Sequence, residues 1–428
     1  MSNAAFTRLG SANTYDNALR NLTSRQSSLA NLQENLTSGK RVVRASDDPT
    51  GAAQAERAQT RLERVKSDQR ALEAQRNSIA AAEGALGDVT DALQTFRELV
   101  VSAGNAAFSP AERRSVAVQL SGLRDQIFAL SNRTDSNGLP LFSALGSALA
   151  PFVGPNAPPQ DYTFQGLPGQ AASTEVTIPF SLDGDAAFMH QPARDGVYNV
   201  TVASTTGVIP SNRTLQTNNV TVSDPALVNG SAYSIAITGI DTTTTPGTTT
   251  VTYDVTETPS VGGPFTALTA SYPTITTGDK AGTGSIPITV MPGLSMTITG
   301  TPAVGDVVTV DTSPSLFSVL DDAIRDVGGA GNNNAASQAV SQALFNLDIG
   351  MERVSAVRGR AGDLLNRADR ITTNQEKRSV QLEADRSRAE DLDMIKGISD
   401  FQNQQTGYQA ALQSYAQVQK LSLFNYIG

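Results

Sequence analysis

Residues 58–100 read AQTRLERVKSDQRALEAQRNSIAAAEGALGDVTDALQTFRELV, and this stretch decides how the chain folds. Every seventh residue is apolar within otherwise charged and polar sequence: Ala58, Val65, Leu72, Ile79, Leu86, Leu93 and Val100. From Ile79 onward, Ala82, Val89 and Phe96 alternate with these positions, which gives the three-four spacing of helices that pack at a shallow angle. At 1.5 Å per residue, the stretch predicts one helix of about 65 Å.

A helix of this length needs partners. Burying each core residue contributes roughly 1.5–3 kcal/mol, whereas ordering each residue of the backbone costs about 1–2 kcal/mol. One apolar stripe does not offset that cost, because most residues of the helix bury little surface. We therefore expect other helices of the chain to pack along it.

Capping signals delimit this helix and the next one. A helix over about residues 1–40 ends at Gly39, Asp48 is the predicted N-cap of the long helix, and Pro49 is its first residue. Ser109-Pro-Ala-Glu112 is a capping box, and the helix that follows it should stop at Asp135-Ser-Asn-Gly138. Two long helices joined by a short turn predict the start of a bundle.

The composition changes between about residues 141 and 312. Thr supplies 31 of the 160 residues from 151 to 310, and that stretch carries 11 acidic and 3 basic residues. The apolar pattern shortens to strands separated by Gly, Pro, Asn and Asp, as in an antiparallel sandwich or barrel. The predicted strands are Val176–Phe180, Val197–Val202, Tyr233–Ile240, Thr249–Val255, Ile286–Val290, Ser295–Thr299 and Val307–Val310.

Helical spacing returns after Pro314, with a flexible break near Gly328-Gly-Ala-Gly331, and one apolar pattern then runs from Val340 to Ile395. The sequence therefore predicts an α+β protein: a long-helix coiled-coil bundle formed by the N- and C-terminal segments, with an inserted antiparallel β domain. The expected segments are a terminal helix (1–45), the N-terminal half of the bundle (46–140), the Thr-rich β domain (141–312), the C-terminal half of the bundle (313–390) and a second terminal helix (391–428).

Both ends of the chain have thin apolar faces. A helix so weakly apolar is marginal by itself and becomes ordered against a neighbour. We expect the two terminal helices to be disordered or ordered by assembly, through coupled folding and binding. The alternative is ordinary packing within one molecule. The candidate assembly residues are Tyr15, Leu22, Leu29, Leu32, Leu36, Tyr408, Leu412, Tyr415, Val418 and Leu421.

Composition excludes several classes of function. The chain has no Cys and one His, so disulfides, thiolate metal sites and Cys nucleophiles are excluded. A net charge of -9 argues against binding nucleic acid. No run of 18 apolar residues predicts a membrane span, and no basic region followed by an apolar run predicts a cleavable secretory signal.

The residues that suggest chemistry have simpler explanations. Asp47 and Asp48 are adjacent carboxylates that could bind a cation. Asp48 is instead explained as the N-cap of the long helix, and Asp47 as a carboxylate in contact with solvent. His190 lies in a Gly- and Pro-rich loop without a catalytic pattern, and is expected to be an exposed spectator. The cluster at residues 328–331 lacks the Lys of a phosphate loop and is expected to be a hinge. We therefore expect no enzyme, no metal and no cofactor.

Several stretches resemble the flagellin superfamily. RVVRASDDPTGAA at residues 41–53 is similar to the bend after the first helix of flagellins and hook-associated proteins. The C-terminal stretches ISDFQNQQTGYQAALQ (398–413) and LSLFNYI (421–427) are similar to hook-associated proteins of the hook-filament junction, whereas flagellins tend to close with a shorter leucine-rich tail. The resemblance covers about residues 1–145 and 335–428.

The resemblance implies a structural subunit of the bacterial flagellum that is secreted unfolded through the flagellar type III apparatus. It also implies a ring of like subunits at the hook-filament junction, with the first hook-associated protein and flagellin as axial neighbours. An export chaperone is expected on the C-terminal helix before secretion. Two alternatives remain open: a flagellin, which would polymerise indefinitely, and a secreted type III adhesin or effector that binds a host ligand through residues 150–310.

Overall fold

A computed structural model describes residues 3–156, 162–205, 207–243, 248–259, 271–277 and 284–427, except for the side chains of 3–15, 248, 271–277, 284 and 418–427. The chain divides into two units. The first contains Met1–Arg70 and Thr372–Gly428, and the second contains Ala71–Ile371. The long helices α2 (Pro49–Ala103) and α7 (Asn333–Glu390) contribute residues to both units.

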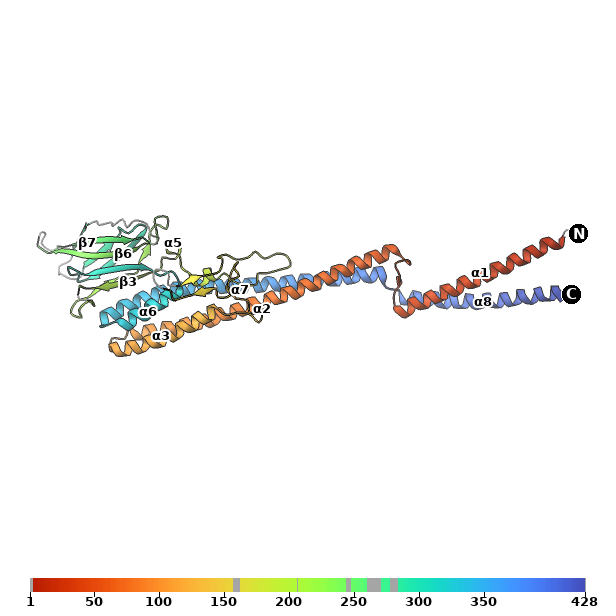
Figure 1. The fold of residues 1–428 in the computed structure, drawn as a ribbon, viewed down its shortest axis with the longest axis horizontal. Helices are drawn as coiled ribbons and strands as arrows, with labels where there is room; N and C mark the ends of the chain where they lie inside the picture. The colour runs from red at the N-terminus through yellow and green to blue at the C-terminus, as the bar shows by residue number, and fades with distance from the viewer. Residues whose placement is uncertain are drawn as a thin grey trace. The chain divides into compact units, whose positions relative to one another are not determined.

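The helices of the second unit share one continuous apolar core. They are α2, α3 (Pro110–Ser131), α6 (Leu316–Gly329) and α7, and α3 packs against α6 (Figure 1). All of the predicted heptad positions of α2 are buried, and Ile79, Leu86 and Leu93 are fully enclosed. The three-four spacing therefore marks the buried stripe of α2, as predicted.

The predicted capping signals are also present. The Asp48 side chain accepts hydrogen bonds from the backbone N–H groups of Thr50 (3.2 Å) and Gly51 (3.0 Å) at the start of α2. Ser109 and Glu112 form the capping box of α3. Helix α3 ends at Ser131, earlier than predicted. The reason is that residues 135–138 form a separate turn around the Asp135 carboxylate.

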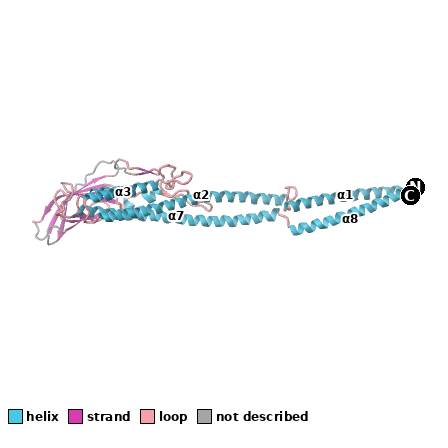
Figure 2. Ribbon diagram, turned by 90° about the horizontal axis from the view of Figure 1, so that it is seen from below, coloured by secondary structure: helices cyan, strands magenta, loops and turns pink. Residues whose placement is uncertain are grey.

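The β domain consists of two antiparallel sheets. One has the order β3-β11-β6-β7-β8, and in the other β10 pairs with β4, β5 and β9 (Figures 1 and 2). The strands are β3 (Tyr198–Ala203), β4 (Leu215–Thr217), β5 (Thr221–Val222), β6 (Ala232–Asp241), β7 (Thr248–Thr258), β8 (Ser271–Thr277), β9 (Gly284–Ile288), β10 (Leu294–Gly300) and β11 (Val307–Thr312). The α+β class with an inserted antiparallel β domain is therefore confirmed.

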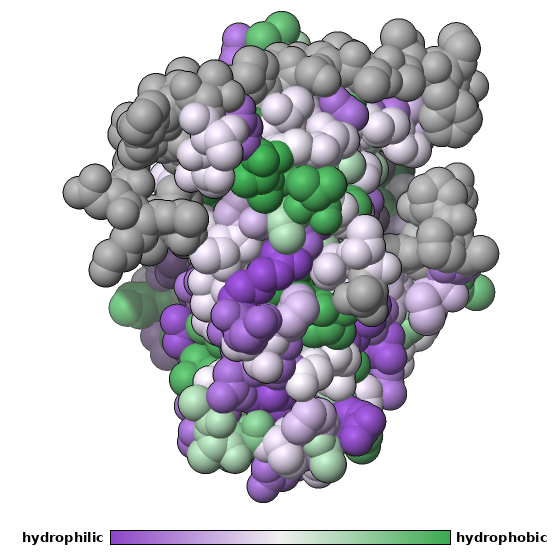
Figure 3. All heavy atoms as spheres, turned by 90° about the vertical axis from the view of Figure 1, so that its left-hand side faces the viewer, coloured by the Kyte–Doolittle hydropathy of each residue, from purple (hydrophilic) through white to green (hydrophobic). Residues whose placement is uncertain are grey.

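Alternation along the strands separates the core of the β domain from its surface. Val308 and Val310 of β11 are fully enclosed, while Thr309 between them is only half-buried. The face of the molecule drawn in Figure 3 carries polar, neutral and apolar residues side by side. Alternation along the strands is what a sheet with one solvated face requires.

The strand predicted at Val176–Phe180 is wrong. This segment is irregular backbone that lies against α2. Gln75 accepts a hydrogen bond from the N–H of Ile178 at 3.1 Å, and the Ser78 hydroxyl donates to the carbonyl of Phe180 at 2.7 Å. Helix side chains thus satisfy backbone groups that a neighbouring strand would otherwise satisfy.

Short elements missed in the sequence complete the helical core. They are β1 (Phe152–Val153), β2 (Thr163–Phe164), α4 (Gly184–Phe188) and α5 (Pro192–Asp195). They bring Phe152 and Phe188 against Phe317 of α6, with ring centroids 5.5 and 5.6 Å apart. The part of the chain that precedes β3 therefore contributes Phe152 and Phe188 to the core of the helices.

The first unit has far less core. Its apolar cluster of buried residues contains Leu62, Val65 and Leu382. It also contains α1 (Asn3–Ser38) and α8 (Met394–Ile427), which lie side by side in both views (Figures 1 and 2). The apolar pattern predicted as continuous to Ile395 is interrupted, because α7 ends at Glu390 and α8 begins at Met394.

Candidate assembly interface

The predicted assembly residues lie on the terminal helices α1 and α8, which contact each other closely. A Cβ atom added at Gly397 would lie 2.8 Å from the Leu392 side chain and 3.2 Å from that of Leu36. One at Gly407 would lie 2.7 Å from the guanidinium of Arg25. Glycine at these two positions of α8 therefore permits the close approach of α1.

The described candidate residues are only partly covered by this pairing. Leu412 is 42% exposed, and the half-buried residues are Leu22, Leu29, Leu32, Leu36, Tyr408 and Tyr415. The side chains of Tyr15, Val418 and Leu421 lie outside the described residues. Among the side chains described on α1 and α8, no apolar one is buried. The role of all these residues in assembly stays a prediction.

Backbone hydrogen bonds join the two connections next to this helix pair. Gly39 ends α1 with a φ of +72°, a left-handed conformation that favours glycine. Its carbonyl accepts from the N–H of Leu392 at 2.9 Å, and the N–H of Arg41 donates to the Glu390 carbonyl at 2.8 Å. Lys40 and Glu390 also form an ion pair. The connection that follows α1 is thereby fixed to the end of α7 and to the connection between α7 and α8.

The adjacent carboxylates at the start of α2 serve this local structure. The Gly51 N–H, the Thr50 hydroxyl and the Arg41 guanidinium lower the pKa of Asp48 to about 2. Asp47 accepts hydrogen bonds from the backbone of residues 43 and 44. Across the residues that the structure describes, no group of three His, Cys, Asp or Glu side chains is placed to bind a metal.

His190 is buried, so the prediction that it is exposed is wrong. Its loop pairs with the segment that leaves the β domain: the His190 N–H donates to the Pro314 carbonyl at 2.8 Å, and Nδ1 lies 3.3 Å from the Ser313 carbonyl oxygen. Burial lowers the pKa of the imidazole to about 4. The ring is therefore neutral at physiological pH.

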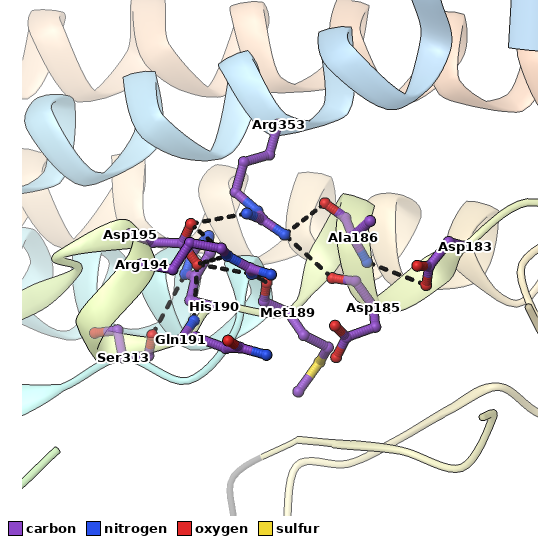
Figure 4. Close-up of polar contacts among 10 residues, drawn as sticks. All are labelled: Asp183, Asp185, Ala186, Met189, His190, Gln191, Arg194, Asp195, Ser313 and Arg353. Atoms are coloured by element: carbon purple, nitrogen blue, oxygen red, sulfur yellow. Dashed lines mark hydrogen bonds and ion pairs between the residues drawn. The ribbon is translucent and has the colours of Figure 1, made fainter. Parts of the chain in front are cut away.

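Beside His190, Arg353 of α7 makes a partly buried ion pair that the sequence did not predict. Its guanidinium donates to Asp195 Oδ1 at 2.7 Å and to the Ala186 carbonyl at 2.6 Å (Figure 4). Arg194 binds the same Asp195 carboxylate at 2.8 Å. No sequence signal marks this pair, because 158 residues separate Arg353 from Asp195.

The start of α8 carries exposed apolar residues that were not proposed as interface. Met394, Ile395 and Ile398 are 45%, 85% and 46% exposed. The sequence placed Ile395 in the buried stripe of the preceding helix, and the break at residues 391–393 overturns that assignment. The described helices include none that is long and apolar enough to cross a membrane.

Two family models match the ends of the chain. The model described as the bacterial flagellin N-terminal helical region matches residues 11–146, and the model of the bacterial flagellin C-terminal helical region matches residues 344–427. Together these matches cover just over half of the sequence. The chain belongs to the flagellin superfamily. The N-terminal match contains α2 and α3, and the C-terminal match contains most of α7 and all of α8.

Within the flagellin superfamily, the chain is similar to hook-associated proteins and to flagellins. It is 35% identical over 153 residues to flagellar hook-associated protein 3 of Salmonella typhimurium, covering 34% of this chain and 46% of that protein. It is 36% identical over 124 residues to a flagellin of Bacillus subtilis, covering 28% and 41%. The chain thus spans under half of the length of these curated relatives.

Solved structures share the fold over most of their length. The flagellar hook-associated protein 3 of Legionella pneumophila superimposes with a TM-score of 0.56 and 22% identity, covering 77% of this chain and 97% of that one. FlgL of Xanthomonas campestris gives a TM-score of 0.53 at 22% identity, covering 77% and 98%. At this level of identity the likeness supports a common fold.

Proposed function

We propose that this chain is a structural, non-catalytic subunit of the bacterial flagellum that forms the junction between hook and filament. Its terminal helices would make coiled-coil contacts with neighbouring subunits. The similarity to hook-associated protein 3 supports this assignment, as does the C-terminal sequence quoted above.

One structural observation carries the proposal. The apolar residues at the heptad positions of α2 from Leu72 to Val100 are enclosed within the second unit, whereas the apolar residues described on α1 and α8 are only half-buried or exposed. A pair of helices with this little buried surface gains its stability from further partners. Head-to-tail contacts between like subunits would cover these faces and propagate a ring or helical lattice.

The proposed partners follow from this role. They are like subunits within a ring, with the first hook-associated protein and flagellin as axial neighbours. Before secretion, an export chaperone would cover the C-terminal helix and shield its partly exposed apolar residues. The assembled protein would lie outside the cell, on the flagellum.

A flagellin is the second candidate, because both family models are flagellin models and a curated flagellin is 36% identical over its matched part. The two functions differ in what the protein does when it is mixed with flagellin. A junction protein supplies a fixed layer on which flagellin polymerises, whereas a flagellin is incorporated along the filament. An adhesin would instead bind a host ligand and tolerate loss of its terminal helices.

The test combines mixing with truncation. Deletion of residues 409–428 is expected to abolish junction assembly on hooks, while circular dichroism shows that the β domain and the second unit remain folded. With the full chain, labelled protein is expected only at filament bases. Label along whole filaments would favour the flagellin alternative, and normal assembly of the truncated chain would overturn the proposal.

A matched pair of substitutions sharpens this test. Leu29→Gln changes a half-buried residue of α1, whereas Val118→Gln changes a residue of α3 that is 71% exposed. Only Leu29→Gln is expected to reduce the yield of assembled junctions, by tenfold or more, with both purified proteins folded. Equal yields from the two variants would contradict a role for this face of α1.

A further inference from the structure

The β domain contacts the helices of the second unit with incomplete apolar packing. Its core and the core of the helices are separate clusters. A cavity of about 390 Å³ lies between them, lined by Val202 and Leu215 of the β domain and by Ala339 of α7, among others. Interlocked apolar side chains therefore do not hold the two parts together at this point.

Amide side chains occupy one face of α7 along this contact. We call Asn334, Gln338, Gln342 and Asn346 the amide row; they are spaced four residues apart, which places them on one side of the helix. Gln338, Gln342 and Asn346 are more than nine-tenths buried. Buried amides are costly unless they are hydrogen-bonded, so their partners are informative.

The N-terminal half of the amide row binds β4 and the loop before it. Gln338 makes a reciprocal pair with Thr217: its Nε2 donates to Thr217 Oγ1 at 2.7 Å, and its Oε1 accepts from the Thr217 N–H at 3.0 Å. Asn334 Nδ2 donates to the carbonyl of Arg213 at 3.0 Å.

The C-terminal half of the amide row binds the place where the chain enters the β domain. Gln342 and Asn346 both donate to the carbonyl of Tyr198, at 3.0 and 2.8 Å. Tyr198 begins β3 and pairs with Thr312, the last residue of β11. The segments that enter and leave the β domain therefore run next to each other, and we call this pair of segments the crossing. Asp195, which forms an ion pair with Arg353, precedes Tyr198 in the sequence.

We propose that the amide row sets the orientation of the β domain on the helices. A single attachment at the paired crossing would let the β domain rotate about it, because the apolar contact beyond it is incomplete. The bonds to Thr217 and Arg213 supply a second point of attachment, on the other sheet. Hydrogen bonds are directional and admit one register, whereas apolar contacts tolerate sliding. This inference does not depend on the proposed function.

Spin labels test the proposal directly, because the chain has no Cys of its own. Val118→Cys on α3 and Leu227→Cys on the β domain introduce labels at positions that are 71% and 58% exposed. Double electron-electron resonance on the full chain is expected to show one narrow distance distribution. The triple variant Gln338→Leu, Gln342→Leu and Asn346→Leu is expected to widen that distribution at least twofold, with unchanged circular dichroism.

A control triple changes exposed amides of the same helix: Asn366→Leu, Asn374→Leu and Gln381→Leu. It is expected to leave the distribution narrow. A narrow distribution in a folded amide-row variant would overturn the proposal and assign the orientation to the other contacts between the β domain and the helices. Should the triple fail to fold, Gln342→Leu alone removes one of two donors to Tyr198 and is expected to widen the distribution measurably; an unchanged width there would also overturn the proposal.

Discussion

The two units of this chain carry similar helical patterns and bury them to different degrees. In the second unit, Leu86 and Leu93 of α2 are fully enclosed. In the first, the buried apolar cluster comprises Leu62, Val65 and Leu382, and no apolar side chain described on α1 or α8 is buried. The same heptad spacing thus leads to a core in one region and to a partly open surface in the other.

The difference shows that spacing determines which face of a helix is apolar, while the number of neighbours determines how well that face is covered. In the second unit, the helices α3, α6 and α7 surround the apolar stripe of α2, together with residues such as Phe142, Phe152 and Phe188. In the first unit, α1 has α8 beside it. Two paired helices cover only one side of each other, so further burial requires other molecules.

The largest expected effect is in the enclosed core. Leu93→Ala should lower the free energy of unfolding by about 2–5 kcal/mol, because it removes buried methyl groups and leaves a cavity. Urea denaturation followed by circular dichroism measures this. Val101→Ala, at a residue of the same helix that is 50% exposed, should change it by no more than about 0.5 kcal/mol. Equal effects would show that the second unit is not tightly packed.

The second unit should also respond to acid through His190. Burial lowers the pKa of this imidazole to about 4 in the folded protein, so between about pH 6.5 and 4 only the unfolded chain binds the proton. The contribution of the neutral His190 imidazole to the free energy of unfolding is complete above pH 6.5 and falls by roughly 2–3 kcal/mol as pH approaches 4.

His190→Gln is the variant that isolates this contribution. Burial raises the pKa of Asp322 to about 6, so its contribution becomes more favourable as pH falls through that value, in parent and variant alike. The free energy of unfolding in urea is therefore measured for both proteins at pH 7 and pH 4.5. The change with pH of the difference between the two proteins reports on His190. A difference that does not change with pH would show that the imidazole is exposed.

A smaller effect is expected at the start of α2. Asp48→Ala removes the N-cap and the ion pair with Arg41, and should destabilise this helix terminus by about 0.5–2 kcal/mol. Hydrogen exchange at the Gly51 amide should become faster, while Glu56→Gln, on the exposed face of the same helix, should leave it unchanged. An unchanged exchange rate in Asp48→Ala would show that the Asp48 cap does not stabilise the start of α2.

The smallest effect is expected in the terminal pair. Leu29→Ala should lower the stability of the isolated chain by about 1 kcal/mol or less, because Leu29 is only half-buried. Thermal unfolding of the isolated protein measures this. A loss as large as that of Leu93→Ala would show that α1 and α8 form a core of their own, and the contrast between the units would disappear.

Much of the fold was predictable because local signals coincide with it. The Pro and capping residues placed the starts of α2 and α3, and alternation placed β6 and β11 within a residue or two. Val176–Phe180 misled because β-branched and aromatic residues also suit an irregular segment buried against a helix. His190 misled because Gly and Pro around a residue report on its backbone and not on what packs over it.

By itself, the sequence determined the helical stripe of α2, the change to a Thr-rich β domain, the capping of the helices and the membership in the flagellin superfamily. These depend on residues close together in the chain, or on its composition. Only the tertiary structure decided the burial of His190, the Arg353–Asp195 ion pair and the amide row on α7. Those contacts join residues more than a hundred positions apart, and sequence spacing carries no information about which distant backbone group will accept a buried hydrogen bond.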